Sequence, residues 1–230
     1  MKALKIMPNI NFKRVLGFTL IELLVCMAII ALLTAMAIPA FSKAMLGAKQ
    51  AKSTGNLKSI GQCIFTYAAD NQGILPMMCG VNGASFGDPL WCLQTLDPYF
   101  SKRGRVILSD PLVPSGRHHA FSDYAANSDV LRCAYPGFSA TETALPMAGL
   151  GGRASNVMMV MAAEDGARPL PNGLWYIGAY SIATNPTAPW GRPSDRGTGK
   201  ILAVFADGHT EAVPKVDFIR NARNYLIVNP

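Results

Sequence analysis

The longest pattern in the chain is a predominantly apolar run near its start. From Phe18 to Ala40 it covers 23 residues, and Glu22 is its only charged residue. At about 1.5 Å per helical residue the run is roughly 34 Å long, which is enough to cross the hydrocarbon core of a bilayer. The pattern therefore predicts one membrane-spanning helix over residues 18–40.

Glu22 does not fit an apolar environment. An ionised side chain at the centre of a bilayer costs roughly 2.5–3.5 kcal/mol on insertion scales, and such residues usually mark a specific partner or pathway. The sequence therefore predicts that Glu22 has a partner.

Beyond the apolar run the periodicity becomes that of a one-sided helix. Leu57, Ile60, Ile64 and then Tyr67 or Ala68 recur at helical spacing, which predicts that this face packs on a domain.

A continuous helix is expected over residues 18–73. Asn71-Gln72-Gly73, followed by Pro76, is a helix stop signal. Pro39 lies inside the helix and lacks a backbone donor, so we expect a kink or a locally weakened segment there.

Residues 74–230 alternate short apolar stretches with glycine- and proline-rich loops. The fold class expected is α+β, with a long N-terminal helix packed on an antiparallel sheet. The predicted strands cover residues 105–108, 156–162, 174–182, 200–206 and 210–213. A short terminal helix over residues 217–226 is expected to bury Phe218, Ala222, Tyr225 and Leu226.

Asp207-Gly208 separates the last two predicted strands. This dipeptide between apolar stretches predicts a hairpin with a two-residue loop.

Composition is that of a folded chain, with 50% hydrophobic and 15% charged residues. The formal net charge is +7, but 4 of the 21 basic residues precede Gly17, and the remainder forms no dense basic stripe. No nucleic-acid partner is therefore predicted. The early basic residues, Lys2, Lys5, Lys13 and Arg14, instead predict a cytoplasmic N-terminus and an exported ectodomain.

Three ordinary interpretations of the N-terminus are possible. Ala35-Met36-Ala37 resembles the cleavage site of a secretory signal peptide, but the apolar run continues past it. Lipidation of Cys26 is disfavoured because a branched residue, Val25, precedes it. A plain uncleaved anchor leaves Glu22 unexplained.

The stretch KRVLGFTLIELLVCMAIIALLTAMAIPAF, residues 13–41, resembles the start of type IV prepilins and type II secretion pseudopilins. A short basic leader ends in Gly17, an aromatic residue follows at Phe18, and Glu22 is the fifth residue after the glycine. Pro39 also stands at a position typical of that family.

The resemblance implies how the chain is processed and used. A prepilin peptidase would cut between Gly17 and Phe18 and methylate Phe18, while Glu22 and Pro39 would serve assembly. The implied partners are the peptidase, other pilin-like subunits, membrane lipid, and an inner-membrane assembly platform with its ATPase. The implied location is the bacterial inner membrane, crossed once, and then a filament.

Three segments follow from this interpretation: a leader over residues 1–17, the long helix over 18–73, and an exported α+β ectodomain over 74–230. The function expected is that of a structural pilin-like subunit of a type IV pilus or a type II secretion pseudopilus. The alternative is a membrane-anchored or exported binding or hydrolytic domain that carries the same signal.

A second stretch, NLKSIGQCIFTYAADNQGILP, is similar to the helix end of a subgroup of pilin-like proteins. That subgroup ends in a histidine, nine residues and then Asp-Gly. Here Asp207-Gly208 is present, but Gly197 stands where the histidine would be, so no role is carried over to that position.

Catalytic and metal motifs are not recognisable in the sequence. It contains no G-x-S-x-G, no H-E-x-x-H and no phosphate-binding glycine loop, so no enzyme activity and no cofactor are predicted. His118-His119 is interpreted as an exposed loop pair. Asp195, Asp207 and His209 are too sparse to predict a calcium site.

We predict that the mature chain begins at methylated Phe18, because a cytoplasmic cut after Gly17 leaves the apolar helix as an anchor. Mass spectrometry of the N-terminus of membrane-extracted protein tests this. A chain beginning at Ile38 would instead indicate an ordinary signal peptide. Replacing Gly17 with leucine should leave the leader attached.

We also predict at least one disulfide among Cys63, Cys79, Cys92 and Cys133, since these residues follow the spanning run and would face an oxidising compartment. A bond of this kind contributes about 2–4 kcal/mol to stability. Peptide mapping without reduction identifies the pairs, and four free thiols in freshly exported protein would contradict the prediction.

Overall fold

A computed structural model describes residues 18–77, 96–100, 104–119, 122–132, 143–167, 170, 173, 176–188 and 191–229. The chain divides into two compact units, Met1–Met45 and Leu46–Pro230. Helix α1 (Leu20–Asp70) contributes residues to both. The predicted leader and Gly17 lie outside the described residues, as do Cys79, Cys92 and Cys133.

The end of α1 confirms the predicted stop signal. The amide of Gly73 donates to the carbonyl of Ala68 at 2.7 Å, the bond of a Schellman cap. Gln72, with φ 58°, occupies the left-handed position that glycine usually takes, and Gly73 follows it with φ 79°. The helix therefore ends three residues before the predicted boundary.

The buried face of α1 is the predicted one. Leu57 and Ile64 are completely buried, Ile60 nearly so, and the next member of the series is Ala68 rather than Tyr67. Tyr67 is half-buried and packs edge-on against Tyr99, with ring centroids 5.6 Å apart. Full burial of each aliphatic side chain stabilises the fold by about 1.5–3 kcal/mol.

In the part of the chain that the structure describes, six strands form one sheet. They are β1 (Tyr124–Asn127), β2 (Met158–Glu164), β3 (Tyr176–Ile177), β4 (Arg192–Pro193), β5 (Lys200–Phe205) and β6 (Thr210–Pro214). The order is β3-β1-β2-β5-β6, and β4 pairs with the end of β2. The pairings are antiparallel except for β1 with β3, which is parallel. The predicted α+β class is confirmed.

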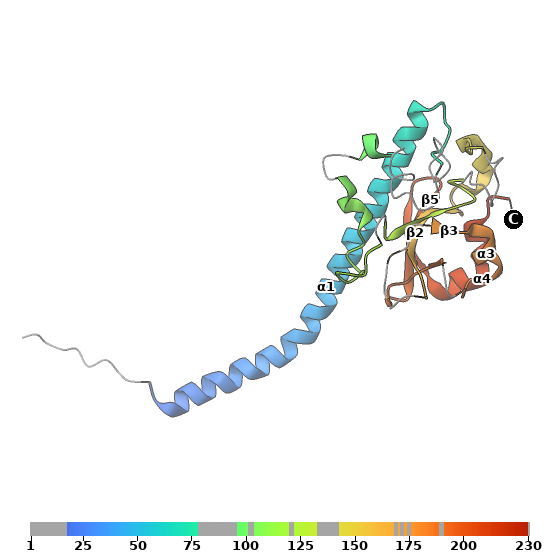
Figure 1. Ribbon diagram of the computed structural model, residues 1–230. Coiled ribbons are helices and arrows are strands. Elements are labelled where there is room, and N and C mark those ends of the chain that lie inside the picture. The colour runs from blue at the N-terminus through green and yellow to red at the C-terminus, as the bar shows by residue number, and fades with distance from the viewer. Residues whose placement is uncertain are drawn as a thin grey trace, which may run out of the picture. The chain divides into compact units, whose positions relative to one another are not determined.

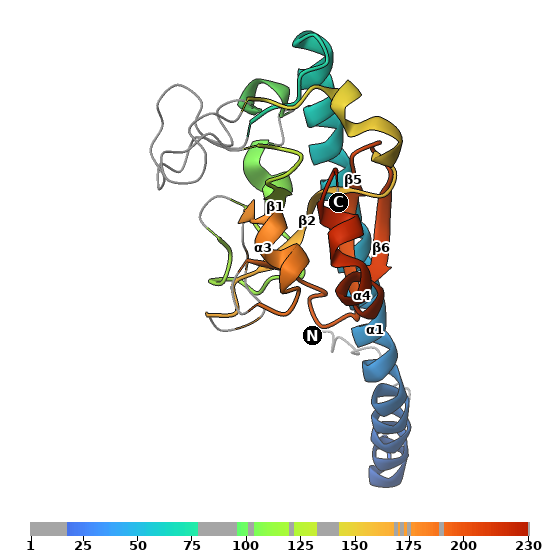
Figure 2. The same ribbon diagram turned by 90° about the vertical axis from the view of Figure 1, so that its right-hand side faces the viewer.

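The sheet separates two cores. Along β5, Leu202 and Val204 belong to the core shared with α1, whereas Ile201, Ala203 and Phe205 belong to the core shared with α3 (Ala179–Thr184) and α4 (Lys215–Leu226). The second part of α1 thus covers one face of the sheet, and α3 and α4 cover the other (Figures 1 and 2). Both faces are buried, as the apolar composition of β2 and β5 requires.

Two predicted strands are wrong in whole or in part. Residues 105–108 lie in the 3₁₀ helix η3 (Gly104–Leu108), where Ile107 and Leu108 are buried. In the predicted strand over residues 174–182, β3 ends at Ile177 and α3 begins at Ala179. Ala179 and Ile182 are buried three residues apart, which is helical spacing.

The other predicted elements are confirmed with shifted ends. The strand expected over 156–162 is β2, those over 200–206 and 210–213 are β5 and β6, and the terminal helix is α4. In α4, Phe218, Ala222 and Leu226 are buried, whereas Tyr225 is half-buried. Two further 3₁₀ helices are η2 (Asp97–Tyr99) and η4 (Met147–Arg153).

The β5–β6 hairpin exists, but its loop is longer than predicted. The amide of Gly208 donates to the carbonyl of Phe205, and the amide of Phe205 donates to the carbonyl of His209, both at 2.9 Å. Gly208 has φ 94°, so the turn is of the three-residue type that ends in a left-handed glycine.

Helix α1 approaches the sheet most closely at Gly61. A Cβ atom added there would lie 2.8 Å from Cγ2 of Val204. Val204 is completely buried, and its branched side chain has little freedom to rotate. The contact between α1 and β5 therefore requires a glycine at position 61.

We predict that Gly61→Ala lowers the stability of the ectodomain by about 1–3 kcal/mol, the usual cost of overpacking. Gly55→Ala is the matched control, because a Cβ atom there meets nothing within 4 Å. That change should raise stability by up to about 1 kcal/mol, through helix propensity. Thermal unfolding of the detergent-solubilised chain measures both, and a Gly61→Ala melting temperature at or above that of the unchanged chain would contradict the prediction.

Candidate functional site

The start of α1 is closed by two side chains that cap each other's backbone. The amide and the hydroxyl of Thr19 donate to Oε2 of Glu22 at 2.9 and 2.8 Å, and the amide of Glu22 donates to Oγ1 of Thr19 at 3.3 Å. This is a capping box, in which a threonine at the N-cap pairs with a glutamate three residues later. Glu22 thus has a partner within its own chain.

The capping box also suits the electrostatics of the helix. The first turn of a helix carries a partial positive charge from its unpaired amides, and a carboxylate there is stabilising. The Thr19-x-x-Glu22 spacing is visible in the sequence and is the signal for this local partner. The free-energy cost of a carboxylate in a membrane predicts only that a partner exists.

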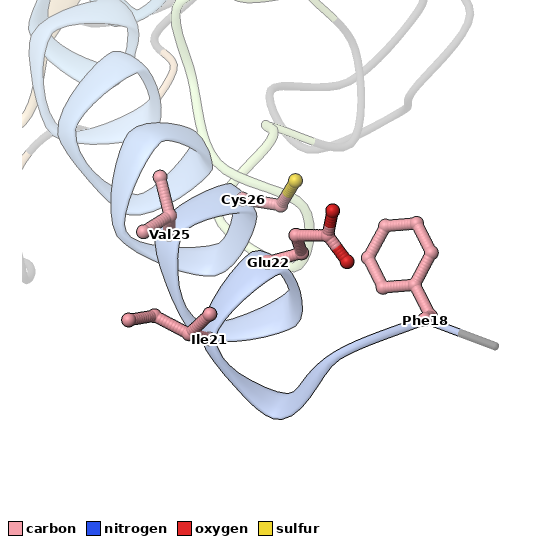
Figure 3. Close-up of a pocket in the computed structure, with 5 residues that line it drawn as sticks. All are labelled: Phe18, Ile21, Glu22, Val25 and Cys26. Atoms are coloured by element: carbon pink, nitrogen blue, oxygen red, sulfur yellow. The ribbon is translucent and has the colours of Figure 1, made fainter. Parts of the chain in front are cut away.

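A hollow of about 300 Å³ lies beside this cap, lined by Phe18, Ile21, Glu22, Val25 and Cys26. In Figure 3 the Glu22 carboxylate and the Phe18 ring lie close together at the beginning of the helix. Apart from Glu22 the lining side chains are apolar or a thiol. The hollow therefore combines one acceptor group with a surface suited to another apolar helix.

The side chains that follow the cap are exposed over several turns. Leu20 is 88% exposed and Met36 71%, and each large apolar residue described between residues 18 and 46 lies on the surface. Among the residues that the structure describes, α1 is the one helix long and apolar enough to span a membrane.

Pro39 lies inside α1, and the helix continues on both sides of it. The hydroxyl of Ser42 donates at 3.1 Å to the carbonyl of Ile38, the residue before Pro39. Pro39 itself has no amide hydrogen to donate. The roles expected for Phe18, Glu22 and Pro39 in processing and assembly remain predictions.

Of the four cysteines predicted to form disulfides, the structure describes Cys63. Its thiol is free and donates to the carbonyl of Tyr99 at 3.2 Å. Burial raises the pKa of Cys63, which keeps the thiol protonated. The pairing among the remaining candidates stays a prediction.

Asp195 and His209, considered together as metal ligands, have separate partners. Asp195 binds Nζ of Lys215 at 3.0 Å. Burial alone would raise the pKa of Asp195, but Lys215 and the amides of Gly197 and Gly199 outweigh it, so the pKa is lowered. Within the described ranges no group of three metal-ligating side chains occurs.

His209 instead forms an exposed pair with Asp207. Its Nδ1 lies 2.6 Å from Oδ1 of Asp207, and its ring stacks on Phe205 with centroids 4.3 Å apart. Burial alone would raise the pKa of Asp207, but its hydrogen bonds with His209 outweigh this effect, so the pKa is lowered.

A buried network of charged side chains was not foreseen from the sequence. Nε of Arg196 donates to Asp110 at 3.0 Å, and Nη2 donates to the carbonyl of Asp123 at 2.9 Å. Asp110 and Asp123 are almost completely buried. Arg196 has φ 51°, an unusual conformation for a residue other than glycine, which these contacts hold in place.

The network continues in both directions. The amide of Arg196 donates to the hydroxyl of Ser194, which donates to Glu164, and Glu164 also binds Arg192 at 2.9 Å. At the other end Nδ1 of His118 contacts the carboxylate of Asp123. His118 is exposed in a loop, as expected, and is also paired with Asp123.

These side chains connect segments that are distant in sequence. Their arrangement indicates a structural role. Removing one member of a buried ion pair typically costs 3–5 kcal/mol, since the other charge is left unpaired. No sequence spacing announces the network, because its members come from loops and strand ends spread between residues 110 and 196.

Comparison with protein families matches residues 12–38 to the prokaryotic N-terminal methylation motif. The resemblance to a prepilin signal is thus confirmed, and the motif is that of a type IV pilin-like or pseudopilin-like precursor. A motif of this type is that of a structural pilin-type protein and implies processing by a prepilin peptidase and assembly with other pilins. Together with the apolar helix it indicates membrane anchoring. No curated protein and no solved structure matched the chain.

Proposed function

We propose that this protein is a pilin-like subunit of a type IV pilus or a type II secretion pseudopilus. The observation that carries the proposal is the methylation motif over residues 12–38, which runs directly into a helix whose apolar side chains are exposed over several turns. Such a surface requires either lipid or other helices as its neighbours. A subunit that moves from the membrane into a filament exchanges lipid for other helices as the neighbours of this surface.

The mechanism that we propose is mechanical. After the cut between Gly17 and Phe18 the chain is held in the inner membrane by α1, with the N-terminus cytoplasmic and the ectodomain exported. An assembly platform and its ATPase then extract the subunit, and α1 packs among the corresponding helices of its neighbours. Methylation of the new amine would complete the processing.

Glu22 provides the register of this packing in our proposal. In the single chain its carboxylate is held by Thr19, which reduces the cost of carrying it in an apolar segment. Removal of the leader creates a positive amine on Phe18. An incoming Glu22 that meets the Phe18 amine of a neighbour satisfies both charges, whereas a helix that has slipped satisfies neither.

We predict that Glu22→Gln leaves the protein folded, inserted and cleaved, but greatly reduces its incorporation into filaments. Glutamine is also accepted at this position of a capping box, so the change removes the charge and keeps the cap. Electron microscopy and shearing of filaments from cells that produce the variant measure the effect.

Asp70→Asn is the matched control, because it removes a carboxylate from the last turn of the same helix, outside the apolar run. This variant should assemble normally. Abundant normal filaments of Glu22→Gln would show that the charge is not needed for assembly.

A further inference from the structure

The ectodomain contains a polar pocket that the proposed function does not use. It has a volume of about 340 Å³ and is lined by Arg153, Asn156, Asn221, Asn224 and Tyr225. Arg153 ends η4, Asn156 lies in the turn before β2, and the other three residues belong to α4. Every lining side chain can form hydrogen bonds, and the one charge among them is positive.

Arg153 is only partly satisfied by the protein. Its Nη2 donates to the carbonyl of Asn224 at 2.8 Å, whereas its buried Nε has no acceptor among the described residues. Because Nε is closed to solvent, a ligand in the pocket would meet the guanidinium through its terminal nitrogens. A guanidinium carries five donors in a fixed plane, and its preferred ligands are carboxylate and phosphate groups.

Helix α4 is irregular at the pocket. Asn221 has φ −124° and ψ 24°, so the helix is kinked there, and its Nδ2 donates to the carbonyl of Asp217 at 3.2 Å. Asn221 and Asn224, three residues apart, are both exposed and both line the pocket. Together with Asn156 they present three amides, each able to donate and to accept.

Tyr225 contributes a neutral hydroxyl and part of an aromatic ring. Its ring stacks on Phe218 with centroids 6.1 Å apart and meets Phe205 edge-on. Burial, followed by the charges of Glu211 and Asp217, raises the pKa of Tyr225. The hydroxyl therefore stays protonated at neutral pH, and neither of those two carboxylates lines the pocket.

We propose that this pocket binds a saccharide that carries a carboxylate, such as a hexuronate. Arg153 would take the carboxylate, and the amides of Asn156, Asn221 and Asn224 would exchange hydrogen bonds with hydroxyl groups, which likewise donate and accept. The volume is within the range of small-ligand pockets. A lining with three amides and no aliphatic side chain favours a polyhydroxylated ligand over an apolar acid.

The test is a titration of the full chain in detergent micelles with D-glucuronate, followed by NMR of ¹⁵N-labelled asparagine side chains. The amide signals of Asn156, Asn221 and Asn224 should shift and saturate. Glucose lacks the carboxylate and acetate lacks the hydroxyl groups, so each loses part of the proposed hydrogen bonds and should bind at least roughly tenfold more weakly.

Two variants locate the site. Asn156→Asp is nearly isosteric and places a negative charge in the lining, so it should weaken glucuronate binding at least roughly tenfold. Gln62→Glu adds the same charge on the exposed surface of α1 and should leave binding unchanged. Arg153→Gln should abolish saturation, while thermal unfolding verifies that the variant is folded.

Several results would overturn the proposal. Acetate or inorganic phosphate binding as tightly as glucuronate would define a simple anion site, and equal binding of glucose would remove the role of Arg153. An absence of saturable shifts, or equal affinity in Asn156→Asp, would show that the pocket does not bind this class of ligand. None of these measurements depends on filament assembly.

Discussion

The contact between Gly61 of α1 and Val204 of β5 is the interaction on which the ectodomain depends. It brings the helix axis close enough to the sheet for Leu57, Ile60 and Ile64 to be covered. A larger residue at position 61 would hold the two layers apart and open a gap along the whole seam, and gaps of that kind forfeit dispersion contacts on both sides. Because α1 supplies one wall of the core, this part of the helix belongs to the same compact unit as the sheet, residues 46–230.

The buried ions constrain the loops in the same way that the glycine constrains the layers. Arg196 holds Asp110 and the backbone of Asp123, and these loops flank β1, whose Tyr124 hydroxyl lies 2.9 Å from Ser53 of α1. Burial and the charge of Asp110 raise the pKa of Tyr124, so its hydroxyl remains neutral in that setting. The same loops therefore support the seam with α1 through a polar contact next to the apolar one.

The sequence was informative where a pattern is local and periodic. The length of α1, its buried face at Leu57, Ile60 and Ile64, the last two strands and the terminal helix all follow from spacing alone. The failures have one physical cause, which is that tertiary contacts override propensity in short segments. Residues 105–108 are rich in β-branched and aliphatic side chains, yet they form η3, with Ile107 and Leu108 buried in the core shared with α1. The ion network and the pocket beside α4 lay beyond prediction, since both bring together segments that are distant in sequence and whose relative paths no periodicity specifies.

The capping box does not by itself require a glutamate at position 22. As a partner for Thr19 in the capping box, glutamine would serve nearly as well, because either side chain accepts from the N-cap amide. Glutamine would also be cheaper in an apolar segment, since it carries no charge to desolvate. The cap therefore explains how the carboxylate is tolerated, but it does not explain why the residue is charged. A charge that is costly in lipid and unnecessary for the helix has to be balanced by a positive group, and the amine created at Phe18 is the nearest one that processing would supply.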